Sequence, residues 1–179
     1  MVYVFISLTL LMIVGPIIAI LPSARQKERM KMRMAARAAG VSVELTAINH
    51  PNEKQLEVVM EAGRDSSPSL KLVCYRLQRK RSKEWRQFPR QAWRIFRDSN
   101  NTWQWDRSFG SGVSIEFEVW VAPVLSTLPV DVFQIKEENF NISLYWNEGT
   151  QGDEKVVLKF LKDCEKFLQV EFEDQKSLQ

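Results

Sequence analysis

Few side chains in this sequence are of the types that perform catalysis. His50 is the only histidine, so no second imidazole is present to share a metal ion or to complete a catalytic site. Cys74 and Cys164 have no neighbouring Cys or His, a pattern typical of buried, reduced thiols. Glycine-rich phosphate loops, HExxH and GxSxG are all absent from the sequence. We therefore predict that the protein is not an enzyme and holds neither a cofactor nor a metal.

Glu116 and Glu118 are the remaining candidates for acid–base chemistry. They lie in the segment from Ser114 to Val121, where apolar residues alternate with mostly polar ones. This alternation predicts a half-buried strand and places both carboxylates on one face of it. A hydrolase could use such a pair, but the same pattern is usual on the solvent face of an antiparallel sheet. We interpret the two residues as solvent-exposed.

A basic segment with interspersed aromatic residues runs from Arg76 to Arg97, with nine bases and one acid. Bases neutralise phosphates and aromatic rings stack on nucleobases, so one function of this segment would be polyanion binding, to nucleic acid or anionic lipid. Residues 98–179 carry fifteen acids and seven bases, so pairing with the protein's own acidic part is an equal alternative. A solvated basic face is the simplest interpretation. The candidate contacts are Arg79, Lys80, Arg81, Lys83, Trp85, Arg86, Arg90 and Trp93.

The N-terminal segment from Met1 to Leu21 contains no charged side chain. As a helix it would span about 30 Å, the thickness of a bilayer core, so we predict a transmembrane helix over 1–21. A cleaved signal peptide needs bases before the apolar run, whereas the first base here is Arg25, after it. Six bases follow between Arg25 and Arg37, and the positive-inside rule then places the N-terminus in the periplasm and the rest of the chain in the cytoplasm.

A basic juxtamembrane helix is expected over 22–40. Ser23 and Gln26 match a capping box, and Gly40 is suited to end the helix in the left-handed conformation. Four arginines recur at every fourth position and form a stripe that can reach anionic headgroups; the alternative is a solvated flank that enforces topology. These arginines are Arg25, Arg29, Arg33 and Arg37.

The segment 41–170 is expected to form one cytoplasmic α+β domain, with 171–179 as a tail. Alternating apolar residues predict a mostly antiparallel sheet, and apolar residues at helical spacing from Val156 to Leu168 predict a C-terminal amphipathic helix packed on it. Residues 54–62 and 84–97 fit helix or strand equally. Besides the segment at Glu116, the predicted strands are Val41–Ile48, Leu70–Gln78, a short one at Trp103 and Trp105, Val130–Ile135 and Phe140–Trp146, the last two joined by a turn at Lys136–Asn139.

Three short motifs carry a resemblance to a known group of proteins. They are the run Leu21-Pro22-Ser23 leading into the arginine-rich helix, then Cys74-Tyr75-Arg76, and finally Tyr145-Trp146-Asn147-Glu148. In these the chain resembles uncharacterised bacterial inner-membrane proteins labelled YajC-like, after an accessory subunit of the preprotein translocase. The resemblance implies a bacterial inner-membrane location and association with the translocase. We expect a single-pass, membrane-anchored, non-catalytic interaction or accessory protein with a protein partner.

Overall fold

The computed structural model describes residues 23–49, 69–80, 92–98, 100–110, 112–149 and 153–177, together with 3, 6–7 and 10–14 near the N-terminus. The chain divides into two units, Met1–Met34 and Ala35–Gln179. Among the described residues, no helix is both long enough and apolar enough to cross a membrane. Most of the predicted span over 1–21 lies outside the described residues, as do His50 and the segment 54–62.

Helix α2 (Ala24–Ala38) follows the N-terminal segment, and its two ends are those that the sequence predicts. At the start, the Gln26 amide donates to the Ser23 hydroxyl at 3.3 Å, while the Gln26 side chain accepts from the Ser23 amide at 2.8 Å. This reciprocal pair is a capping box. At the end, Gly40 has a φ of 83°, and the Val41 amide donates to the Ala36 carbonyl at 3.0 Å. A left-handed glycine with this hydrogen bond is the usual way to end a helix.

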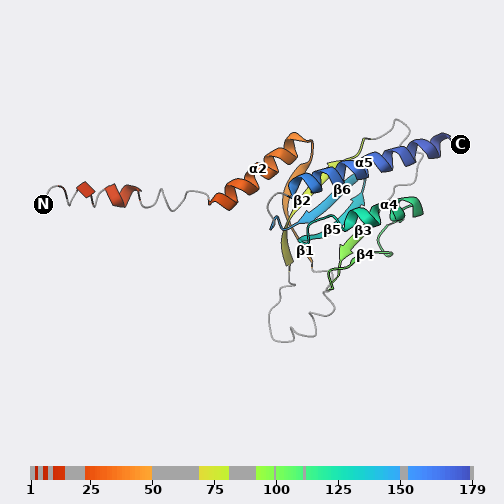
Figure 1. Ribbon diagram of the computed structural model, residues 1–179, viewed down its shortest axis with the longest axis horizontal. Coiled ribbons are helices and arrows are strands. Elements are labelled where there is room, and N and C mark those ends of the chain that lie inside the picture. The colour runs from red at the N-terminus through yellow and green to blue at the C-terminus, as the bar shows by residue number, and fades with distance from the viewer. Residues whose placement is uncertain are drawn as a thin grey trace. The chain divides into compact units, whose positions relative to one another are not determined.

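The second unit is an α+β domain built on one antiparallel sheet of six strands, in the order β1-β2-β6-β5-β3-β4. Helix α5 (Glu154–Ser177) lies along one face of this sheet (Figure 1). The predicted α+β class and the packed C-terminal helix are confirmed, but α5 includes 171–177, which we had predicted to be a tail. The strands are β1 (Ser42–Asn49), β2 (Ser69–Gln78), β3 (Trp93–Arg97), β4 (Trp103–Trp105), β5 (Val132–Glu138) and β6 (Asn141–Trp146).

The predicted turn at Lys136–Asn139 is displaced in the structure. Strand β5 continues to Glu138, and the turn into β6 is made by Asn139 and Phe140, whose φ angles are 52° and 63°. Two positive φ angles suit a two-residue hairpin because the turn then matches the twist of its strands. The Phe140 carbonyl accepts from the amide of Arg79 at 2.8 Å, so this turn also holds the end of β2.

The strand predicted from Ser114 to Val121 is wrong, because residues Ile115–Leu125 form helix α4. Every fourth residue from Phe117 is also apolar and buried, namely Phe117, Val121 and Leu125, so the segment carries a helical period beside the alternating one. Ser114 caps the helix by accepting from the Phe117 amide at 3.2 Å. Glu116 and Glu118 lie in the first turn, where negative charge is favoured by the helix dipole.

The face of the sheet away from α5 has a smaller apolar cluster of its own. Leu72, Cys74 and Tyr145 are buried there, with Ile48 and Phe133 packed against them. Because a register shift interrupts β5 between Val132 and Gln134, Phe133 can join this cluster. Burial raises the pKa of Tyr145 to about 12 and also raises the pKa of the Cys74 thiol. Both groups are therefore neutral at physiological pH.

Alkaline pH tests this description of Tyr145. Because its pKa is higher in the folded chain than the ordinary value near 10, the neutral phenol stabilises the fold fully below pH 10, and this stabilisation is lost as pH rises through 12. We expect the free energy of unfolding to fall more steeply over that range in the wild type than in Tyr145→Phe. The difference in tyrosinate absorbance between the two proteins should titrate near pH 12. A difference that titrates near pH 10 would contradict the buried phenol.

Candidate interaction surface

One side of α4 is anchored in the core by aromatic contacts. Phe117 is fully buried, with its ring centroid 5.1 Å from that of Trp93 on β3 and 6.5 Å from that of Trp105 on β4. Phe167 of α5 lies 5.7 Å from Phe117 and stacks on Trp120 at 4.9 Å. Contacts between aromatic rings at these distances add to the free energy of simple burial. The orientation of α4 is therefore set by the sheet and by α5 together.

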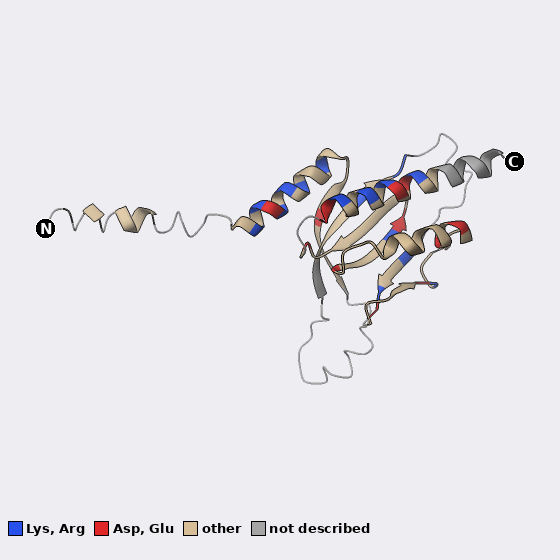
Figure 2. Cartoon of the chain, in the orientation of Figure 1, with Lys and Arg blue, Asp and Glu red and all other residues tan. Residues whose placement is uncertain are grey.

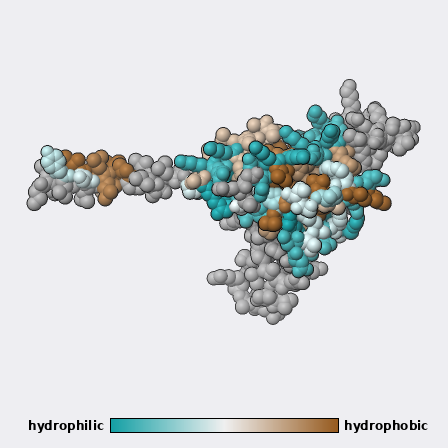
Figure 3. All heavy atoms as spheres, in the orientation of Figure 1, coloured by the Kyte–Doolittle hydropathy of each residue, from teal (hydrophilic) through white to brown (hydrophobic). Residues whose placement is uncertain are grey.

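The other side of α4 is also apolar but faces solvent. The side chains of Ile115 and Val119, one helical turn apart, are 77% and 70% exposed, and Ala122 and Pro123 continue the same exposed side. Val130, which follows the helix, is 69% exposed. Figure 3 shows hydrophobic atoms at the surface over α4. A contiguous exposed apolar patch on a folded domain is a common mark of an interaction site. We call Ile115, Val119, Ala122 and Pro123 the α4 patch.

Acidic side chains border the α4 patch at its N-terminal end. Glu116, which follows Ile115 in the first turn of the helix, is exposed. Glu118 accepts two hydrogen bonds from Arg107, at 2.5 Å and 3.0 Å, and the guanidinium lies 5.7 Å from the ring centroid of Trp105. Its hydrogen bonds to Glu118 raise the pKa of Arg107, which stays charged. An apolar surface with an acidic border is complementary to an apolar surface with a basic border.

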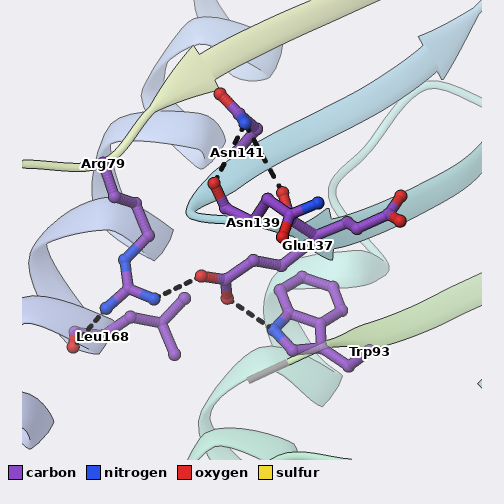
Figure 4. A network of polar contacts seen from close by, with 7 residues as sticks. Arg79, Trp93, Glu137, Asn139, Asn141 and Leu168 are labelled. Carbon is purple, nitrogen blue, oxygen red and sulfur yellow. Dashed lines mark hydrogen bonds and ion pairs between the residues drawn. The ribbon is translucent and has the colours of Figure 1, made fainter. Parts of the chain in front are cut away.

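Two of the predicted polyanion contacts, Arg79 and Trp93, are buried instead (Figure 4). The Arg79 guanidinium donates to one carboxylate oxygen of Glu137 and, at 2.7 Å, to the carbonyl of Leu168 in α5. The Trp93 indole donates to the other oxygen of Glu137 at 2.8 Å. Neither side chain is exposed to a phosphate or a nucleobase, so Arg79 and Trp93 are removed from the predicted contact set. The network joins the residue that follows β2 to β3, β5 and α5.

Other bases of the segment from Arg76 to Arg97 also have partners within the chain. Arg94 forms an ion pair with Asp106, and its Nε donates to that carboxylate at 2.8 Å. Arg97 donates to the carbonyls of Leu128 and Pro129 at 3.2 Å and 3.1 Å. Since Glu137 and Asp106 belong to the acidic part of the chain, the internal-pairing interpretation of this segment is the one that its described residues support.

The remaining predicted contacts are divided between exposed and undescribed positions. Lys80 is exposed at the end of β2. On α2, Arg25 and Arg37 are exposed, whereas Arg29 and Arg33 are half-buried. The structure gives no description of Arg81, Lys83, Trp85, Arg86 and Arg90. Polyanion binding through this segment therefore stays a prediction, with a smaller set of residues.

The cysteines are the only thiols of the chain, and both are buried. Burial raises the pKa of Cys164 well above its usual value, so the thiol is neutral and poorly nucleophilic. Within the part of the chain that the structure describes, no group of three or more His, Cys, Asp and Glu side chains could hold a metal ion. The chemistry that the described residues do display is apolar contact and charge pairing.

The α4 patch was not predicted from the sequence, because the alternating apolar residues from Ser114 to Val121 indicated a strand. The signals that could have found it were Ser114 as a helix cap and the four-residue spacing of Phe117, Val121 and Leu125. In the helix, Ile115 and Val119 lie opposite the buried stripe. The predicted strand would have placed these two residues on the buried face.

Comparison of the chain with known protein families, with curated proteins and with solved structures finds no match.

Proposed function

We propose that this chain is a single-pass, membrane-anchored, non-catalytic interaction protein that binds a partner protein through the α4 patch. The observation that carries the proposal is the exposure of Ile115 and Val119 on a helix whose other side is fixed in the core. A surface on a rigid element keeps its shape when a partner binds, which lowers the entropic cost of binding. The partner surface would be apolar with lysine or arginine at its border, to match Glu116.

The uncharged residues from Met1 to Leu21 support the anchor, and the six bases that follow support a cytoplasmic position for the domain. Tethering to a membrane raises the local concentration of the domain near other proteins of that membrane. Translocase subunits are the first partners to test, because the family resemblance implies an accessory role beside them. A modest apolar patch would be sufficient for an interaction within one membrane.

Site-specific photo-crosslinking tests the proposal in the full-length chain. Benzoylphenylalanine at position 119 should form a discrete adduct with a membrane-associated protein, and the same probe at exposed Lys159 of α5 should not. Ile115→Asp should reduce the adduct about tenfold, because it removes a large apolar side chain from the patch and places a carboxylate against the apolar part of the partner surface. Aspartate is favourable in the first turn of a helix, so this variant keeps α4 folded.

Leu45→Asp is the matched control, because Leu45 on β1 is also an apolar side chain with 77% exposure. It should leave the adduct at position 119 unchanged. Mapping of the crosslinked peptide should show an apolar segment with basic neighbours. Equal crosslinking from positions 119 and 159, an adduct insensitive to Ile115→Asp, or adducts with lipid alone would each overturn the proposal.

A further inference from the structure

The predicted arginine stripe of α2 is exposed only at its ends, Arg25 and Arg37, and is half-buried at Arg29 and Arg33. Met32 and Ala36 are buried at 5% and 0% exposure, and Arg29 and Arg33 lie half-buried beside them. A helix turns by about 100° per residue, so the side opposite this group consists of residues at positions 27, 30, 31, 34 and 38. This exposed side of α2 is therefore distinct from the arginine stripe.

This exposed side combines apolar and cationic residues. Met30 and Met34 are 63% and 56% exposed, and Lys27 and Lys31 are exposed next to them. Glu28, the one acid of the helix, is half-buried on the flank between this side and the buried one. Figure 2 shows how strongly lysine and arginine predominate along α2. Long apolar side chains set between lysines are characteristic of helices that lie in a membrane interface.

We propose that this side of α2 lies flat on an anionic phospholipid surface, with Met30 and Met34 entering the interface and Lys27 and Lys31 at the phosphates. The two exposed methionines distinguish lipid from nucleic acid, because a nucleic acid backbone offers no apolar layer to receive them. The inference rests on the proposed anchor for proximity: the uncharged segment ends at Leu21, and α2 begins at Ala24. Each lysine near an anionic surface adds to the electrostatic attraction.

A fluorescent probe on the full-length chain tests this contact. An environment-sensitive dye attached through Met34→Cys can be directed to that site, because both native thiols are buried. The chain is incorporated into vesicles of phosphatidylcholine, with or without phosphatidylglycerol. With phosphatidylglycerol we expect the emission to shift to the blue and to intensify several-fold, and 1 M salt should reverse most of this change because the screening length falls to about 3 Å. The same dye on Lys159→Cys should not respond.

Paired charge variants sharpen the result. Lys27→Gln with Lys31→Gln should remove most of the response at position 34, while Lys155→Gln with Lys159→Gln, an equal loss of charge on exposed positions of α5, should not. Failure of the anchor would appear separately, as chain that does not float with phosphatidylcholine vesicles. Chain that floats while the dye at position 34 reports water in both vesicles, or responds no more than at position 159, would overturn the inference and leave the anchor standing.

Discussion

Replacement of Glu137 by Gln should lower the free energy of unfolding by about 3–5 kcal/mol. Glu137 is 1% exposed and Arg79 is 8% exposed, so the substitution leaves a guanidinium buried without its counter-charge. The amide oxygen of glutamine can still accept from the Trp93 indole, so the measured change in stability does not include the loss of that hydrogen bond. Urea unfolding of the full-length chain in detergent micelles, followed by tryptophan fluorescence, measures the change.

A double-mutant cycle identifies the cause of that loss. Arg79→Met removes the buried charge. The sum of the stability losses of the two single variants should therefore exceed the stability loss of the double variant by about 1–3 kcal/mol. Glu44→Gln is the control, because Glu44 pairs with Arg76 at 3.3 Å while half exposed, and such surface pairs contribute less than about 1 kcal/mol. Equal effects of Glu137→Gln and Glu44→Gln would show that the buried network does not stabilise the fold.

Replacement of Phe117 by Ala should also lower the free energy of unfolding by about 3–5 kcal/mol. The side chain is completely buried and contacts rings from two strands and from α5, so its removal leaves a cavity that rigid aromatic neighbours cannot fill. Because the same contacts hold α4 in place, the variant should also weaken crosslinking at position 119. The unfolding experiment used for Glu137→Gln measures the first effect.

Val119→Ala is the matched control for Phe117→Ala, since it removes apolar atoms from the same helix only two residues away. Val119 is 70% exposed, and surface substitutions usually change stability by less than about 0.5 kcal/mol. A large loss from Val119→Ala would mean that the α4 patch is packed within the protein and is not available to a partner. A loss below about 1 kcal/mol from Phe117→Ala would contradict the proposed anchoring of α4.

Elements with local signals were predictable from the sequence. The capping box at Ser23 begins α2 and the left-handed Gly40 ends it, and both depend on contacts between residues only a few positions apart. The apolar stripe from Val156 to Leu168 identified α5, because a helix of that length must bury such a stripe. Strands β1 and β6 alternate over six or more residues, enough for the two-residue period to be recognised, and β2 is rich in residues that favour strands.

The candidate site was less predictable, because its residues depend on distant partners. Arg79 lies in a segment rich in bases and aromatic residues, which suggested a phosphate contact. In the core, however, it pairs with Glu137, which is 58 residues away in the sequence. The segment of α4 carries both a two-residue and a four-residue apolar period. The rings of Trp93, Trp105 and Phe167, from three other elements, favour the helix by enclosing Phe117.

The sequence by itself determined the α+β class, the ends of α2, the helical nature of α5 and the segregation of charge along the chain. These depend on composition and on neighbours within a few residues, where the physical rules are local. Only the tertiary structure decided which charges are internal and which apolar residues face outward. The reason is that burial of Arg79 and exposure of Val119 are properties of the assembled sheet and helices, and no short stretch of sequence contains the partners that produce them.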